Sequence, residues 1–143
     1  MSEVRSASGG EGCFACSQTN PIGLKIHFEM QGDVCVGRFT PDVHHVGFDG
    51  VVHGGLIFTA LDDVMANWLH LQGEAGFTAK AAVRYRLPAK VGETLRLEGT
   101  QISRRRRHVQ LSGKALREAD SVLVADVEGT FMLNPVAAAT DME

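Results

Sequence analysis

The sequence contains little that would place the protein in a membrane or outside the cell. None of its apolar runs approaches the ~20 residues needed to span a bilayer, and the polar, glycine- and serine-rich residues 1–12 include no apolar signal-peptide core. Cysteine occurs only at Cys13, Cys16 and Cys35. An odd cysteine count without an export signal favours a reducing compartment. We therefore expect a cytoplasmic protein with no membrane partner.

An excess of positive charge is also absent. The formal net charge is −3, and the only charge run is Arg104–Arg107. This run lacks interleaved aromatic residues, so we expect no nucleic-acid partner. If the run were a strand, alternation would place Arg104 and Arg106 on one face, where they could hold phosphate groups. The alternative is a solvated hairpin or an edge strand protected by its charge.

The length of 143 residues suggests a single domain. We expect a flexible N-terminal tail over residues 1–12, one domain over 13–135 and a C-terminal tail over 136–143. The chain is long enough to bury a core without disulfides or a structural metal. The motif Cys13-x-x-Cys16 is one half of a zinc site at best, because no recognised ligand set completes it. We expect it to be a small apolar anchor, with no bound metal.

Hydrophobic periodicity predicts one long helix and otherwise strands. The helix covers about residues 54–71, with Gly73 as its stop. Apolar residues alternate with polar ones in several other segments. The predicted strands cover 24–30, 34–39 and 79–87, with further strands around 95–97, 109–111 and 123–133, and a loop over 40–53. The helix is apolar on nearly every side, so it must be buried.

No second helix is available to cover the first one. The packing that remains is an α+β arrangement, in which a curved antiparallel sheet of five or six strands wraps around the helix. A sheet this small leaves one side open, and we expect a homodimer to close it.

The helix carries two adjacent carboxylates with different surroundings. Its polar residues form one stripe, consisting of Thr59, Asp63, Asn67 and His70. Asp63 therefore faces solvent or a polar seam. Asp62 lies on a mostly apolar face, where burial raises a carboxyl pKa, and such residues are frequent at functional sites. The alternative is that Asp62 pairs with Arg84 or Lys80, or lines a wet dimer interface.

The start of the helix is the second candidate site. His53 is followed by Gly54 and Gly55, which let a ligand approach the backbone, and free N–H groups there favour an oxyanion. A plain tight turn is the alternative. Gly54 and Asp62 are about 12 Å apart along a helix. Both can act on one bond only if Asp62 comes from a partner whose helix runs antiparallel.

These residues resemble the helix signature of hotdog-fold acyl-CoA thioesterases of the phenylacetyl-CoA and 4-hydroxybenzoyl-CoA type. The segment 50–55 (GVVHGG) matches that signature, and Asp62 stands where the family has its acidic residue. Further similar segments are 13–16 (CFAC) with 20–24 (NPIGL), and 83–88 (VRYRLP) followed by Gly92. The similarity covers about residues 13–134, and Ser17 departs from it where one branch commonly has glycine.

The resemblance implies hydrolysis of an acyl-CoA thioester, with no cofactor beyond the coenzyme A of the substrate. The N–H of Gly54, with Gly55, would polarise the carbonyl, and Asp62 would activate water or attack the carbonyl itself. His53 is a further candidate catalytic residue, which could instead orient the loop or contact the substrate. Asn67, Thr78 and Asp63 would contact the substrate. Asp63 is the fallback carboxylate.

The resemblance also bears on the arginines and on assembly. Arg104 and Arg106 could hold the coenzyme A phosphates, and a dimer of dimers is expected. The alternative function is a non-catalytic acyl-CoA binding or sensing module on the same fold. A hotdog hydratase is disfavoured, because its usual histidine segment is not recognisable here.

Overall fold

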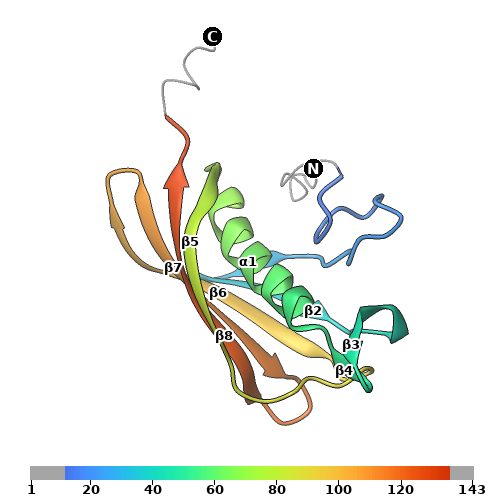
Figure 1. Ribbon diagram of the computed structural model, residues 1–143. Coiled ribbons are helices and arrows are strands. Elements are labelled where there is room, and N and C mark those ends of the chain that lie inside the picture. The colour runs from blue at the N-terminus through green and yellow to red at the C-terminus, as the bar shows by residue number, and fades with distance from the viewer. Residues whose placement is uncertain (1–11, 136–143) are drawn as a thin grey trace.

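The computed structural model describes residues 12–135 and consists of one helix packed across one face of a curved sheet (Figure 1). The helix is α1 (Gly54–His70). The six-stranded antiparallel sheet has the order β1-β2-β6-β7-β8-β5. Its strands are β1 (Glu29–Gln31), β2 (Val34–Phe39), β5 (Gly76–Tyr85), β6 (Leu95–Arg105), β7 (His108–Arg117) and β8 (Val122–Leu133). This is the predicted α+β, hotdog-type architecture.

The two predicted tails, residues 1–12 and 136–143, lie outside the described residues except for Gly12. Within residues 12–135, no helix is long and apolar enough to cross a bilayer.

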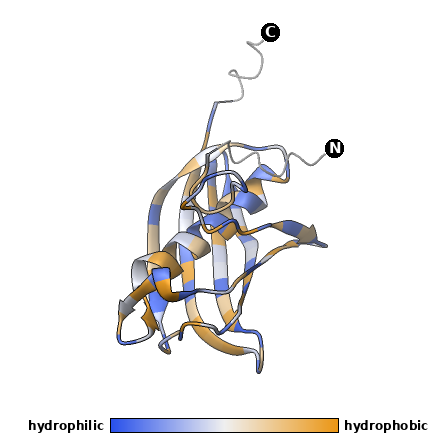
Figure 2. Cartoon of the chain, turned by 90° about the vertical axis from the view of Figure 1, so that its right-hand side faces the viewer, coloured by the Kyte–Doolittle hydropathy of each residue, from blue (hydrophilic) through white to orange (hydrophobic). Residues whose placement is uncertain are grey.

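The core lies between α1 and the concave face of the sheet. Leu61, Val64 and Met65 are fully buried there. Orange and blue segments alternate along the strands that lie behind the helix (Figure 2). Gly99 of β6 permits the close contact, because a Cβ at this position would lie 2.8 Å from the carbonyl oxygen of Val64. The helix ends as predicted near Gly73, which has a φ of 84° and donates its N–H to the carbonyl of His70.

The N-terminal segment differs from the prediction. Of the strand expected over 24–30, only Glu29 and Met30 pair within the sheet, as part of β1 (Glu29–Gln31). The backbone N–H groups of Leu24 and Ile26 instead donate to the carbonyls of Phe14 and Ala15. The alternating pattern is real, since Ile26 is buried, but its backbone partners come from residues 14–15. This pairing holds the segment against the rest of the domain.

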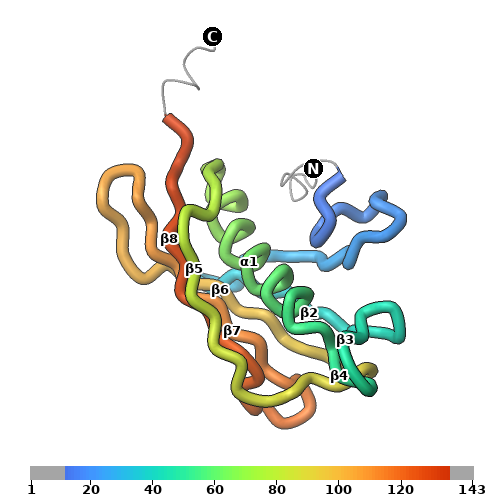
Figure 3. The backbone as a smooth tube through the Cα atoms, in the orientation of Figure 1, coloured from blue at the N-terminus to red at the C-terminus, as the bar shows by residue number. Residues whose placement is uncertain are grey.

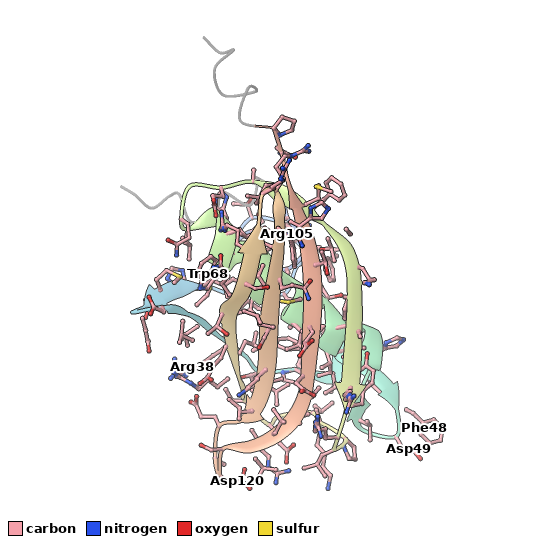
Figure 4. All side chains as sticks on the ribbon, turned by 90° about the vertical axis from the view of Figure 1, so that its left-hand side faces the viewer. Arg38, Phe48, Asp49, Trp68, Arg105 and Asp120 are labelled. Carbon is pink, nitrogen blue, oxygen red and sulfur yellow. The ribbon has the colours of Figure 1, made fainter. Side chains whose placement is uncertain are left out.

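The predicted loop over 40–53 contains short ordered elements. A 3-10 turn (Val43–His45) is followed by a small hairpin of β3 (Val46–Phe48) and β4 (Val51–Val52). This hairpin leads directly into α1, and Phe48 and Asp49 lie at its tip (Figure 4).

Strand β5 forms one edge of the sheet and pairs only with β8 within the described residues. The side chains of β5 are unusually exposed for a strand with alternating apolar residues. Phe77 is 58% exposed, and Tyr85 is 53% exposed. A long, unpaired strand edge with exposed apolar groups is a surface that proteins normally cover.

Candidate active site

The first turn of α1 offers one free backbone donor. His53 is the N-cap, and its Nδ1 accepts a hydrogen bond of 2.9 Å from the N–H of Gly55. The N–H of Gly55 is therefore occupied. The N–H of Gly54 has no acceptor within residues 12–135. Of the two predicted donors, Gly54 is the one left available to an oxyanion.

This cap gives His53 a structural role that can be measured. Replacement of His53 by alanine is expected to lower the free energy of unfolding by about 1 kcal/mol, because the N–H of Gly55 loses its acceptor. Replacement by asparagine, a strong N-cap, should restore most of the loss. Urea denaturation at a fixed protein concentration measures both values. An alanine variant as stable as the wild type would show that the cap contributes nothing.

A cavity of about 390 Å³ lies beside Gly54. It is lined by Val51, Val52, Gly54, Ile57, Tyr85, Arg86, Leu87, Pro88, Ala89 and Val124. The hydroxyl of Tyr85, on β5, donates a 2.8 Å hydrogen bond to the carbonyl oxygen of Gly54. From the sequence, Tyr85 was only a residue of the strand predicted over 79–87. Its hydrogen bond fixes the helix start against one end of β5.

Asp62 lies at the other end of β5. Its Oδ1 accepts a 2.7 Å hydrogen bond from the hydroxyl of Thr78, and the side chain is half-buried. Burial raises the pKa of Asp62, and the Thr78 hydrogen bond partly opposes this rise. No ion pair with Lys80 or Arg84 forms within the described residues, which removes that alternative. A carboxylate with a raised pKa and a single neutral partner is suited to accept a proton.

Asp63 is more enclosed than Asp62. Burial raises the pKa of Asp63 to about 6, although the thiols of Cys16 and Cys13 favour its ionised form. The Asn67 amide nitrogen donates to the Asp63 carbonyl oxygen at 3.0 Å and to its Oδ2 at 2.9 Å. The sequence predicted that Asp63 faces either solvent or a polar seam, and the structure shows the polar seam. Asn67 is buried and holds Asp63 in place, and its contact with a substrate stays a prediction.

Residues 104–107 form a hairpin, which is one of the arrangements predicted for this arginine run. Strand β6 ends at Arg105, and Arg106 takes a φ of 57° in the turn to β7. Both guanidinium NH groups of Arg104 bind the carboxylate of Glu74, at 2.6 and 2.8 Å. Arg104 is therefore occupied by an internal partner. The tip of this hairpin projects from one end of the sheet (Figure 3), at the opposite end from Asp120 (Figure 4).

Within one subunit, the two halves of the predicted site stay apart. Gly54 and Asp62 are separated by about 12 Å of helix, and they contact opposite ends of β5 through Tyr85 and Thr78. A single long helix packed across a curved antiparallel sheet is the hotdog architecture. Sequence comparison then gives the family.

The sequence profile of the thioesterase superfamily matches residues 49–124, more than half of the chain, and the protein belongs to this superfamily. No curated protein matches the sequence.

Solved structures share the fold. A thioesterase superfamily protein matches with a TM-score of 0.78 and 30% identity, over 84% of this chain, which spans 62% of that protein's length. The Escherichia coli PaaI protein from the phenylacetic acid degradation operon matches with a TM-score of 0.73 and 18% identity, over 78% of this chain and 81% of its own.

A third neighbour carries a ligand. A hypothetical thioesterase from Streptococcus pneumoniae, solved with coenzyme A, has a TM-score of 0.71 and 17% identity, over 76% of this chain and 88% of its own. The same protein was solved as an aspartate-to-alanine variant and as a threonine-to-alanine variant.

Proposed function

We propose that the protein hydrolyses an acyl-CoA thioester in a homodimer, at a site built from Gly54 of one subunit and Asp62 of the other. Membership of the thioesterase superfamily supports the reaction class. The coenzyme A in the streptococcal neighbour supports the choice of thiol.

The contacts of β5 carry the proposal of a shared site. Thr78 binds Asp62 at one end of this strand, and Tyr85 binds Gly54 at the other. If β5 paired with a second β5 about a two-fold axis between Ala81 and Ala82, Thr78 of each subunit would lie opposite Tyr85 of its partner. Asp62 of one subunit would then approach Gly54 of the other. The same pairing would cover the exposed edge of the sheet.

The chemistry follows from the two groups. The N–H of Gly54 stabilises the negative charge that develops on the carbonyl oxygen. Asp62 takes a proton from water as the oxygen of that water bonds to the carbonyl carbon. The carbon–sulfur bond then breaks, and the thiolate of coenzyme A receives the proton. In the alternative route, Asp62 attacks the carbonyl carbon, the carbon–sulfur bond breaks and the thiolate of coenzyme A leaves. Water then hydrolyses the resulting anhydride, which frees the acid and regenerates Asp62.

Thr78 supports this assignment of Asp62. The aspartate and the threonine replaced in the streptococcal protein are sixteen residues apart, the same separation as Asp62 and Thr78. The Thr78 hydroxyl donates to Oδ1 and leaves Oδ2 for a water molecule. Thr78 therefore orients the base at the edge of the dimer interface.

The choice of arginine for coenzyme A depends on which guanidinium group has no partner within the protein. Because Arg104 is paired with Glu74, Arg106 is the member of the run that we propose for contact with a phosphate of coenzyme A. It is exposed, and it has no partner within residues 12–135.

Subunit mixing tests the shared site. An Asp62→Asn chain and a Gly54→Pro chain are co-expressed with different tags and the heterodimer is purified. Each variant alone is expected to be about a hundredfold or more less active than the wild type. One of its two sites then combines an intact Gly54 with an intact Asp62, so it should recover about half of the wild-type activity, because one of two equivalent sites is whole. Parental homodimers purified in the same way are the controls.

The outcome separates the possible functions. A heterodimer no more active than its parents would contradict a shared site. A wild-type protein that binds acyl-CoA tightly but hydrolyses none of a broad acyl-CoA panel would instead support the binding or sensing module.

A further inference from the structure

A second group of reactive side chains lies next to the proposed site but takes no part in it. The ligand atoms of Cys13, Cys16 and Asp63 all lie within 4.8 Å of one another. The two cysteines come from the N-terminal segment, and Asp63 comes from the middle of α1. The sequence showed only the Cys-x-x-Cys half of this group, and the fold supplies a carboxylate to it.

The spacing of the three side chains suits a tetrahedral cation. With zinc–sulfur bonds of about 2.3 Å and zinc–oxygen bonds of about 2.0 Å, tetrahedral ligand atoms lie roughly 3.5 to 3.8 Å apart. The Sγ of Cys13 is 3.7 Å from Oδ1 of Asp63. Small side-chain adjustments would bring the three ligand atoms around one ion, because all of them already lie within 4.8 Å of one another.

The surroundings hold the ligand atoms in this orientation. The N–H of Cys16 donates to the Sγ of Cys13 at 3.3 Å, and the same N–H could donate to a metal-bound thiolate. The amide of Asn67, only 3% exposed, binds Oδ2 of Asp63 at 2.9 Å and leaves Oδ1 toward the cysteines. Outer partners of this kind fix the ligands of metal sites.

The group is also accessible. A cavity of about 230 Å³ opens beside it, lined in part by Cys13, Asp63 and Asn67, and Cys13 is partly exposed. The cavity provides a path for an ion and room for a water molecule in the fourth position. Two thiolates among the ligands select a thiophilic ion such as Zn²⁺ over Mg²⁺ or Ca²⁺.

We propose that Cys13, Cys16 and Asp63 bind one Zn²⁺ ion, which fastens the N-terminal segment to α1. The ion would hold this segment at the residue next to Asp62 without taking part in hydrolysis. The proposal is independent of the proposed thioesterase activity, because its ligands and its measurements do not involve that reaction.

Cobalt substitution tests the site in the full-length protein. Metal-free, fully reduced protein is titrated with Co²⁺. We expect saturation at one equivalent, an intense thiolate-to-cobalt charge-transfer band in the near ultraviolet and visible bands typical of tetrahedral Co²⁺. One equivalent of Zn²⁺ should then displace the Co²⁺ and abolish these bands.

Variants assign the ligands. Cys13→Ser and Asp63→Asn should each weaken Co²⁺ binding at least about tenfold. Cys35→Ala is the matched control, because Cys35 is fully buried near Asp63 but lies outside the group. The Cys35→Ala variant should bind Co²⁺ with the affinity of the wild-type protein. Zinc should also protect two thiols of the wild-type protein from alkylation, a measurement that does not depend on any variant folding.

Three results would overturn the proposal. The first is the absence of a thiolate–cobalt band in the reduced wild-type protein. The second is a Cys35→Ala variant that loses binding as the others do. The third is a Cys13–Cys16 disulfide that forms on mild oxidation in a protein that binds no Co²⁺, which would make the pair a redox pair.

Discussion

Replacement of Asp62 by asparagine is expected to lower kcat/KM for acyl-CoA hydrolysis by about a thousandfold, within the range that general-base catalysis contributes. Asparagine has nearly the same shape, and its amide oxygen can still accept the hydrogen bond from Thr78. It can neither take a proton from water nor attack a carbonyl carbon. Release of free coenzyme A, followed with a thiol reagent, measures the rate, and circular dichroism checks that the fold is intact.

Asp63→Asn is the matched comparison. The two carboxylates are adjacent on α1, but Asp63 faces Asn67 and the cysteines, whereas Asp62 faces β5. We therefore expect Asp63→Asn to cost much less activity than Asp62→Asn. An Asp62→Asn enzyme with the wild-type rate would remove Asp62 from the mechanism. A larger loss from Asp63→Asn would transfer the catalytic role to Asp63.

The central elements of this fold could be predicted from the sequence because their signals are local. The α1 helix has continuous apolar character and a glycine after its end. Strand β2 over Val34–Phe39 has the bounds expected from its alternation. The segment 24–30 shows the same alternation and yet forms only a short strand. Its backbone partners, Phe14 and Ala15, lie on another part of the chain, and periodicity along one segment carries no information about them.

Part of the candidate site, like part of the fold, could be predicted from the sequence. The stripe along the helix separated Asp62 from Asp63, and the structure gives the two carboxylates different environments. Thr78 donates its hydroxyl to Asp62, and its predicted contact with a substrate stays a prediction. Three contacts could not be read from the sequence: the cap of His53 on Gly55, the bond from Tyr85 to Gly54, and the approach of Cys13 to Asp63. Each depends on a side-chain rotamer or on tertiary distance, and neither leaves a pattern in sequence.

These contacts change what the start of the helix can do. Sequence reasoning proposed two donors, at Gly54 and Gly55. Because His53 occupies the N–H of Gly55, the oxyanion would depend on Gly54 and on the positive end of the helix dipole. Tyr85 meanwhile binds the carbonyl of the same residue. The His53 cap and the Tyr85 hydrogen bond therefore both fix the position of the Gly54 N–H. Electrostatic catalysis needs donors that are preorganised in this way.

Replacement of Gly54 by proline removes that single donor and is expected to lower kcat/KM by about a hundredfold or more, as the loss of one oxyanion-hole donor does. Proline suits this position structurally. Gly54 is the first residue of α1, where the N–H has no helical acceptor and proline is favoured. His53 has a φ of −59° and a ψ of 128°, the extended conformation that a following proline requires. The variant should therefore fold, and a thermal melt checks this.

Gly54→Ala separates the loss of the N–H from the effect of added bulk. A Cβ at residue 54 would lie 3.4 Å from the Tyr85 ring, an ordinary contact, and alanine keeps the N–H. We expect it to retain activity within about tenfold of the wild type, since the donor is unchanged. If alanine and proline reduced kcat/KM equally, bulk near Tyr85 would explain both losses, and the N–H of Gly54 would have no part in binding the oxyanion. A large loss confined to proline would place the developing negative charge at this one backbone group.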